Sequence, residues 1–268
     1  MSNDALAALN WLVEAGADEA VAETPVNRLA PISRPAPARI PPPSPAASPA
    51  PQSGDAPDLA LRAAAAATLA ELRAALESFD GIGLRRTATN LVFADGVAAG
   101  GVMLIGEAPG RDEDRVGRPF VGRAGQLLDR MLASIGLDRG RNAYITNVIN
   151  WRPPNNRDPS PEEAALCLPF LRRHIELAEP RLIILLGAVA ARHLVGGTDG
   201  IMKLRGRWLE YRAGETMVPL MPTLHPAYLL RQPAHKKLAW RDLQAVAARM
   251  KLLGLPVERP VEGTGGTG

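Results

Sequence analysis

The alternation of short apolar runs with amphipathic segments constrains the fold of this chain more than any other feature. Four runs of five or six residues stand at 102–106, 143–148, 181–186 and 218–223. Such runs are long enough for buried strands and too short for helices. Helical patterns separate them, and strands that alternate with helices usually pair in parallel. The sequence therefore predicts a three-layer α/β/α fold with a central four-stranded parallel sheet.

The helical patterns between these runs have recognisable ends. A stripe that includes Leu128 and Leu132 stops at Gly136. Residues 160–163 form a capping box with proline at the first helical position, which predicts a helix through His174. We also expect an alanine-rich helix after Gly187 and a basic helix over 236–253.

The N-terminal part of the chain has a different composition. Residues 1–16 show a short helical pattern that could bind another protein or fold back on the domain. Residues 17–57 read as a linker rich in proline and alanine, because eleven of the 25 prolines lie in 25–57. We expect one folded domain over 58–254 and a flexible glycine-rich tail over 255–268.

The predicted domain opens with a helix. Asp58 is its expected N-cap and Ser78 its approximate end. Its apolar stripe consists of Leu61, Leu69, Leu72 and Leu76.

Charge and cysteine content narrow the class of protein. The formal net charge is only +3, but residues 203–251 hold ten Lys/Arg against three Asp/Glu, which favours a polyanionic partner. The single cysteine, Cys167, excludes an intramolecular disulfide and any site built from cysteines alone. Without an apolar run of membrane-spanning length or a signal-peptide pattern, we expect a cytoplasmic protein. We also expect it to be a monomer.

Polar side chains follow three of the four predicted strands. Glu107 and an acidic Gly/Pro loop follow the first, Asn147 lies at the end of the second with Thr146 and Asn150 around it, and His225 follows the fourth. The carboxyl ends of parallel strands meet at one sheet edge, where open α/β folds bind ligands. We therefore expect a pocket there that accepts a flat polar ring.

The segments around these residues resemble the uracil-DNA glycosylase superfamily, and its family 4 in particular. The similarity covers roughly residues 79–250, and its motifs stand in the family's order: GEAPG at 106–110, GRPFVG at 117–122, TNV at 146–148, RPPNNR at 152–157, LRG at 204–206 and HPAYLLR at 225–231. The resemblance implies hydrolysis of the bond between uracil and deoxyribose, after the base is flipped out of the DNA. Such an activity would begin base excision repair.

The resemblance also implies roles for individual residues. Phe120 would stack on the flipped uracil, and Asn147 would read its edge. His225 would donate a hydrogen bond to uracil O2 as negative charge develops on the leaving base. The backbone of the turn at Gly106 and Ala108 would hold the base.

The carboxylate that positions the attacking water is less clearly indicated. We take Glu113 as the first candidate, with Glu107 and Asp114 as alternatives. The family's better-known relatives carry an aspartate where this chain has Ala108.

The DNA contacts implied by the resemblance lie in the basic region. Leu229, Leu230 and Arg231 would enter the minor groove, although a pair of core leucines would give the same pattern. The expected phosphate contacts include Arg205, Lys236 and Lys237, and further Lys203, Arg207 and Arg241.

One feature of the family is missing. Family 4 enzymes hold a [4Fe-4S] cluster with four cysteines, and here Phe79, Ile82 and Trp151 replace three of them, leaving Cys167. Apolar side chains cannot ligate iron. We therefore predict no cluster, no metal and a small apolar core in its place. The function predicted is a metal-independent uracil-DNA glycosylase, with a catalytically weak uracil-DNA binder and a nucleotide-binding α/β hydrolase as alternatives.

Overall fold

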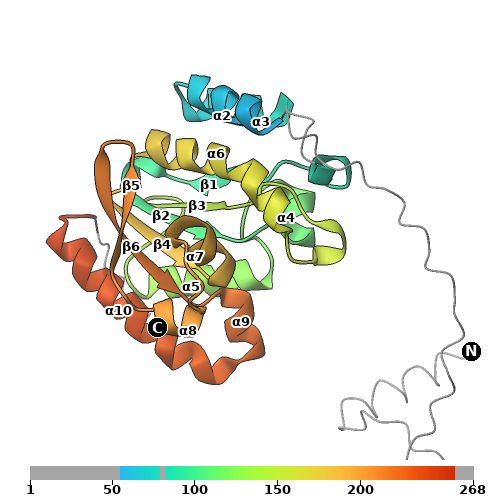
Figure 1. The fold of residues 1–268 in the computed structure, drawn as a ribbon. Helices are drawn as coiled ribbons and strands as arrows, with labels where there is room; N and C mark the ends of the chain where they lie inside the picture. The colour runs from blue at the N-terminus through green and yellow to red at the C-terminus, as the bar shows by residue number, and fades with distance from the viewer. Residues whose placement is uncertain (1–54, 79–82, 257–268) are drawn as a thin grey trace, which may run out of the picture. The chain divides into compact units, whose positions relative to one another are not determined.

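The computed structural model describes residues 55–78 and 83–256 of this chain (Figure 1). The centre of the described part is one six-stranded sheet with the order β1-β3-β2-β4-β6-β5. Its strands are β1 (Ala94–Gly96), β2 (Val102–Gly106), β3 (Ala143–Asn147), β4 (Leu182–Leu186), β5 (Leu209–Ala213) and β6 (Thr216–Thr223). The predicted N-terminal helix over 1–16, residues 17–54 of the predicted linker and most of the predicted tail lie outside the described residues.

The four predicted strands form the parallel centre of this sheet, which confirms the predicted fold class. β3, β2, β4 and β6 are neighbours and run parallel, with Gly106 level with Asn147 and Leu186 level with Thr223. This register brings the segments after the strands to one edge.

Two antiparallel strands, β1 and β5, extend the sheet beyond the prediction. β1 has only three residues and offers no apolar run to detect. In β5 the side chains alternate between half-buried and exposed, which is the signature of a strand that covers one face only.

Helices cover both faces of the sheet. They are α2 (Asp55–Ala65), α3 (Leu69–Ser78), α4 (Arg111–Val116), α5 (Arg123–Ala133), α6 (Pro161–Ala178), α7 (Ala188–Val195), α8 (Ile201–Leu204), α9 (Pro226–Arg231) and α10 (Lys236–Leu252). Short 3₁₀ turns stand at η1 (Gly83–Arg86), η2 (Ala98–Gly100), η3 (Pro154–Asn156) and η4 (Pro233–His235).

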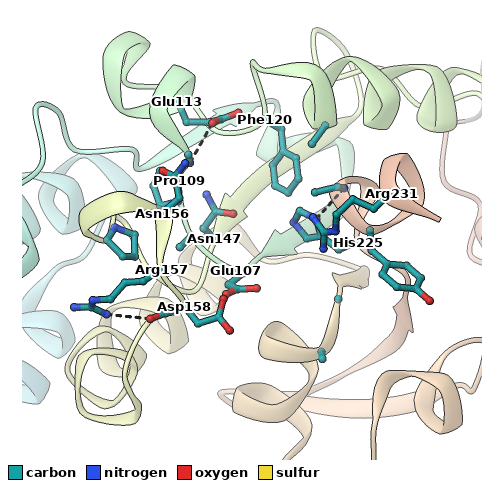
Figure 2. A pocket seen from close by; sticks show the side chains of 18 of the residues that line it. Glu107, Pro109, Glu113, Phe120, Asn147, Asn156, Arg157, Asp158, His225 and Arg231 are labelled. Atoms are coloured by element: carbon teal, nitrogen blue, oxygen red, sulfur yellow. Dashed lines mark hydrogen bonds between the residues drawn. The ribbon is translucent and has the colours of Figure 1, made fainter. Parts of the chain in front are cut away.

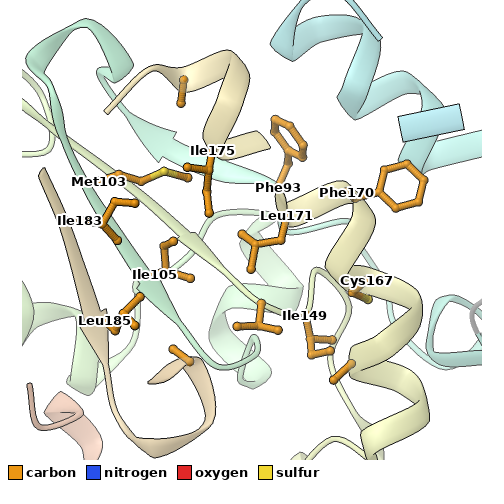
Figure 3. Packing of buried hydrophobic residues seen from close by; sticks show 14 of the residues in the cluster. Phe93, Met103, Ile105, Ile149, Cys167, Phe170, Leu171, Ile175, Ile183 and Leu185 are labelled. Carbon is orange, nitrogen blue, oxygen red and sulfur yellow. The ribbon is translucent and has the colours of Figure 1, made fainter. Parts of the chain in front are cut away.

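Alternate side chains of each central strand belong to different cores. Met103 and Ile105 of β2 pack with α6, α7 and the α2–α3 pair, as Figure 3 shows for the centre of this cluster. Val102 and Leu104 point the other way, toward α5 and α10. This period of two within a continuous apolar run is expected for a sheet covered on both faces.

The helix predicted from Asp58 to Ser78 is two helices, and the first begins at Asp55. The expected N-cap at Asp58 was therefore wrong, and residues 55–57 of the predicted linker are helical. The chain breaks between Ala65 and Leu69, where the Thr68 hydroxyl accepts the Glu71 N–H at 3.2 Å as an N-terminal cap. The freed Ala66 carbonyl accepts two hydrogen bonds from Arg173 of α6, at 2.9 and 2.8 Å. Leu61 of α2 is 71% exposed, whereas Leu59 and Ala63 are buried, so its predicted place in the apolar stripe was wrong.

The other predicted helix boundaries agree with the structure to within a few residues. Ser160 caps α6 and exchanges hydrogen bonds with Glu163, which confirms the capping box. α6 continues past His174 to Ala178, and His174 is buried inside the domain, with Nε2 at 2.8 Å from the Tyr144 hydroxyl. The packed chain also reaches Leu255, which is 6% exposed, one residue beyond the predicted domain boundary. No helix within 55–78 and 83–256 is long and apolar enough to cross a membrane.

Candidate active site

A cavity of about 510 Å³ lies at the carboxyl edge of the parallel strands (Figure 2). Its lining comes from the turn after β2, the end of β3, the loop before α6, the start of α7 and the α9 segment. Glu107, Glu113, Phe120, Asn147 and His225 all contribute to this one cavity. The structure thus brings together the five side chains that the sequence analysis placed around the base.

Asn147 closes the floor of the cavity at the last position of β3. Its side chain is 2% exposed, and its Oδ1 has no hydrogen-bond partner among the described residues. A buried polar atom without a partner typically costs about 1–3 kcal/mol, so it is rarely retained without a use. Gly106 leaves room for the amide, because a Cβ at that position would lie 2.4 Å from Oδ1. Asn147 therefore offers an unused acceptor to a ligand.

His225 forms the opposite wall at the start of α9. Its Nδ1 accepts the Ala227 N–H at 3.1 Å, so the neutral ring carries its proton on Nε2. Burial lowers the pKa of His225 to about 4, and the positive charge of Arg231 contributes to the decrease. At neutral pH the imidazole is therefore an uncharged donor through Nε2.

Phe120 lies between these two residues with an uncommon backbone conformation. Its φ is 54°, in the left-handed region that side chains other than glycine rarely adopt. The ring covers Gly106, where a Cβ would lie 2.6 Å from the Phe120 Cζ, and its centroid is 5.5 Å from that of His225. Phe120 is 6% exposed and belongs to the core that contains Leu104 and Leu128, and it also lines the cavity beside the imidazole.

Two of the three candidate carboxylates organise the backbone. Oε1 of Glu113 accepts the N–H groups of Val121 and Gly122, both at 3.0 Å, and Oε2 accepts that of Gly110 at 3.1 Å. Asp114 is 4% exposed and accepts the N–H groups of Thr89 and Asn90, at 2.8 and 3.1 Å. Glu113 thus fixes the backbone at residues 121 and 122, and Asp114 fixes the backbone at residues 89 and 90.

Glu107 differs from these two carboxylates. Like Glu113 it lines the cavity, but no residue of the described part donates a hydrogen bond to its carboxylate. Burial raises the pKa of its carboxyl group, the negative charge of Asp158 raises it further, and Arg192 opposes both effects. Glu107 is therefore the candidate carboxylate with its oxygens free to bind water.

Other polar residues at the strand ends have structural partners. The Thr146 hydroxyl donates to the Phe93 carbonyl at 2.7 Å, and the Asn150 amide donates to that of Val92 at 3.1 Å. Thr223 donates to Asp242 at 2.7 Å. Conversely, the sequence analysis assigned no individual role to several side chains that line the cavity, among them Asn156, Asp158 and Tyr228. Asn156 lies in the RPPNNR segment, Asp158 directly follows it, and Tyr228 lies within HPAYLLR. Their positions in or beside these motifs were the signal that could have identified them as site residues.

In a comparison with sequence models of protein families, the uracil DNA glycosylase superfamily matches residues 93–244. This range is more than half of the chain and includes every residue that lines the cavity. The chain belongs to the uracil-DNA glycosylase superfamily.

Several curated members of this superfamily are similar to the chain. The type-4 uracil-DNA glycosylase of Thermotoga maritima is 40% identical over 169 residues, which are 62% of this chain and 86% of that protein. The type-4 uracil-DNA glycosylase of Archaeoglobus fulgidus is 44% identical over 154 residues, 56% and 77% of the two chains. A type-5 uracil-DNA glycosylase of Pyrobaculum aerophilum is 35% identical over 119 residues, 38% and 52% of the two chains.

The residues expected to contact DNA fall into two groups in this glycosylase-superfamily fold. Leu230 is half-buried, and Arg231, Lys236 and Lys237 are exposed near the cavity and at the start of α10. Leu229 is 1% exposed and packs against Leu127, Leu224 and Ala239. Of the two neighbouring leucines, it is thus the core residue.

Arg205 also has a structural environment. It forms an ion pair with Asp242 of α10 and donates to the Leu238 carbonyl, and its side chain is 15% exposed. This guanidinium links the loop after α8 to α10, so it is not a free cation for DNA.

The residues at the cluster positions do not fit an iron-sulfur cluster. Trp151 is 2% exposed and Cys167 is fully buried, and both belong to the apolar core that contains Phe170 (Figure 3). Burial raises the pKa of the Cys167 thiol to about 12. One thiol cannot supply the set of cysteine ligands that an iron-sulfur cluster needs. Phe79 and Ile82 lie outside the described residues. Within the described ranges, no group of three or more His, Cys, Asp and Glu side chains could hold a metal ion.

Proposed function

We propose that this protein hydrolyses the N-glycosidic bond of uracil in DNA and so begins base excision repair. The observation that carries the proposal is the unpartnered Asn147 Oδ1 in the cavity that also holds Phe120, His225 and Glu107. Membership of the superfamily and the similarity to type-4 uracil-DNA glycosylases support it.

Base recognition would depend on Asn147 and Phe120. A flipped uracil that stacks on Phe120 would donate its N3–H to Asn147 Oδ1, and its O4 would accept from the amide N–H group. Cytosine presents an acceptor at N3 and donors at N4, so the same amide would face unpaired polar groups. A fixed amide therefore favours uracil and rejects cytosine.

His225 would act on the leaving base. When the bond between C1′ and N1 breaks, its electron pair remains with uracil and negative charge collects on O2. The Nε2–H of neutral His225 would donate to that oxygen. A donor fixed in place stabilises charge that develops in the transition state without reorganising.

Glu107 is the carboxylate that we propose for the water. Its free oxygens could accept one proton of a water molecule as the water oxygen bonds to C1′, and its negative charge would stabilise the cationic sugar. Glu113, which the sequence analysis placed first, would act one step away by holding residues 121 and 122.

The role proposed for Glu107 predicts a pH dependence. Because the pKa of Glu107 is raised and its ionised form is needed, the single-turnover rate is expected to fall as pH decreases through a value above 4.5. His225 is already neutral in that range. In Glu107→Gln the rate should be lower by about 10² to 10⁴-fold and this acid limb should be absent. An unchanged limb in the variant would contradict the role.

The DNA would be held by the exposed basic residues. We propose that Leu230 and Arg231 fill the space left by the flipped base, with Leu229 packed behind them. Lys236 and Lys237 would contact phosphates on one side, which makes affinity fall steeply with salt.

The chemistry proposed requires no metal, and we propose that the protein functions without a cluster. Iron content and visible absorption of protein purified without oxygen test this directly. We expect no iron and unchanged activity in Cys167→Ala. About four iron atoms per chain would contradict the proposal.

The function itself is tested by single-turnover cleavage of an oligonucleotide with one uracil. We expect an abasic product from uracil and none from the matched cytosine oligonucleotide. Tight binding to uracil DNA without cleavage would instead identify a uracil-DNA binder. Failure to bind DNA at low salt would favour a nucleotide-binding hydrolase on the same scaffold.

A further inference from the structure

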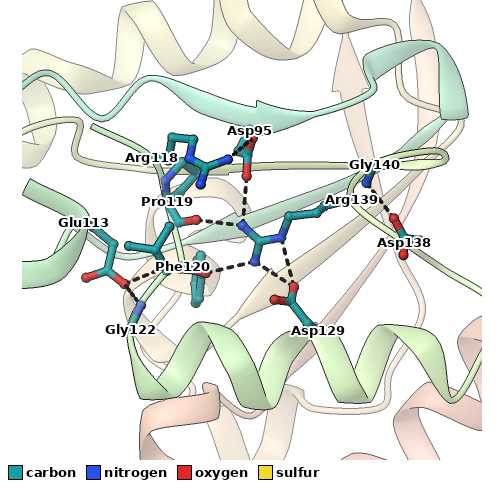
Figure 4. Close-up of polar contacts among 11 residues, drawn as sticks. Asp95, Glu113, Arg118, Pro119, Phe120, Gly122, Asp129, Asp138, Arg139 and Gly140 are labelled. Atoms are coloured by element: carbon teal, nitrogen blue, oxygen red, sulfur yellow. Dashed lines mark hydrogen bonds and ion pairs between the residues drawn. The ribbon is translucent and has the colours of Figure 1, made fainter. Parts of the chain in front are cut away.

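The loop that carries Phe120 is fixed from outside the cavity by one arginine, Arg139 (Figure 4). Arg139 lies in the turn between α5 and β3. Its Nη1 donates to the Pro119 carbonyl at 3.1 Å, and its Nη2 donates to the Phe120 carbonyl at 2.8 Å. Arg139 therefore holds both peptide groups that flank Phe120.

Two carboxylates from different elements orient this guanidinium. Asp95 of β1 accepts from Nη1 at 2.9 Å, and Asp129 of α5 accepts from Nε and Nη2 at 2.9 and 2.7 Å. With the two carbonyl bonds, all five N–H donors of the side chain are used. Since the side chain is only 20% exposed and fully bonded, Arg139 is not available to a DNA phosphate.

The loop is also held on its other side. Glu113 accepts the N–H groups of Val121 and Gly122, directly after the carbonyls that Arg139 binds. Gly125 of α5 allows the close approach, because a Cβ there would lie 1.9 Å from the Phe120 carbonyl oxygen. The left-handed conformation of Phe120 thus has polar partners on both neighbouring peptide groups.

We propose that Arg139 is a positioning residue that sets the plane of the Phe120 ring against the flipped base. Its bonds keep Phe120 in a backbone conformation that it would otherwise leave for a common one. The effect on catalysis comes through Phe120, because Arg139 itself does not line the cavity. This inference rests on the proposed function for its kinetic test and on the structure alone for its second test.

The kinetic test is a double-mutant comparison. Arg139→Lys keeps a positive charge between Asp95 and Asp129 but cannot span both carbonyls and both carboxylates, and Arg139→Gln removes the charge as well. Each is expected to lower the single-turnover rate on uracil DNA by about 10- to 100-fold, as for a small misplacement of a substrate contact. In a Phe120→Ala background the same changes should cost less than about threefold, because the ring that they position is absent. Affinity for an abasic product oligonucleotide should stay within about twofold.

The matched control is Arg141→Gln. Arg141 lies two residues away, has a side chain that is 56% exposed and pairs with Asp138 at 3.8 Å. Arg141→Gln should leave the single-turnover rate on uracil DNA unchanged. Equal losses of rate from Arg139→Lys in the wild-type and Phe120→Ala backgrounds would overturn the proposal, as would an equal loss from Arg141→Gln.

A second measurement does not depend on activity. The Phe120 ring lies 5.5 Å from His225, so its ring current affects the imidazole signals in a ¹H–¹³C spectrum of the whole protein. Those signals, assigned with His225→Gln, should move in Arg139→Lys and stay in place in Arg141→Gln. If the wild-type protein fails to cleave uracil DNA, the proposed function fails while this spectrum still decides the positioning role. Unmoved His225 signals in both Arg139 variants would refute it.

Discussion

Replacing Asn147 with alanine is expected to lower kcat/KM for uracil-containing DNA by about 100- to 1,000-fold. The substitution removes both hydrogen bonds to the uracil edge and leaves N3–H and O4 of the flipped base without partners. Because Oδ1 has no partner in the free protein, its removal breaks no bond within the described part of the fold. The variant should therefore keep its stability while it loses recognition.

Asn150→Ala is the matched control for this prediction. Asn150 is also a buried amide near the end of β3, but it donates to the Val92 carbonyl and does not line the cavity. We expect it to lower the free energy of unfolding by about 1 kcal/mol and to leave kcat/KM nearly unchanged. Full activity of Asn147→Ala, or equal losses in the two variants, would refute the role of Asn147 in reading the base.

Replacing Asp242 with alanine is expected to have the largest effect on stability. Asp242 is 2% exposed and accepts hydrogen bonds from Arg205 and Thr223. Its removal leaves the guanidinium buried without a counter-charge, which costs about 3–5 kcal/mol of the free energy of unfolding. Urea denaturation followed by circular dichroism measures this loss as a lower midpoint.

The burial of this pair also predicts how it behaves when both partners change. Burial raises the pKa of Asp242 although Thr223 and Arg205 both oppose the increase, so the carboxylate loses much hydration in the folded state. The double variant Arg205→Met, Asp242→Leu should therefore lose less stability than Asp242→Ala alone.

Asp199→Ala serves as the exposed comparison. Asp199 pairs with Lys203 at 3.4 Å, and the two side chains are 48% and 77% exposed. We expect a change below about 1 kcal/mol in this variant. Equal losses of unfolding free energy in Asp199→Ala and Asp242→Ala would show that burial does not determine how much the Arg205–Asp242 pair stabilises the fold.

The central sheet could be predicted because each of its strands is marked by a short, continuous segment of the sequence. Each parallel strand is a continuous apolar run, and each is followed by a capped or glycine-ended helix. β5 was missed because its Leu209-Glu210-Tyr211 alternation is weaker than such a run. The break between α2 and α3 has a local signal that the prediction did not use, the capping pattern from Thr68 to Glu71. Its second support, the hydrogen bonds from Arg173 to the Ala66 carbonyl, comes from more than one hundred residues further along the chain and leaves no local pattern.

The sequence predicted which residues form the site better than it predicted what each of them does. Sheet topology places Glu107, Asn147 and His225 at one edge, and the motifs name them. Which carboxylate remains free depends on backbone N–H groups eight and nine residues from Glu113, which composition does not reveal. Likewise, helical phase alone does not decide that Leu229 packs inward while Leu230 remains half-buried.

The packing around Cys167 gives the protein an intrinsic reporter. The chain has one thiol, and it is fully buried and protonated at neutral pH. An alkylating reagent can therefore modify the native protein only after the packing around this part of α6 opens. The rate of covalent labelling at this sulfur would measure the opening of that layer without any engineered label.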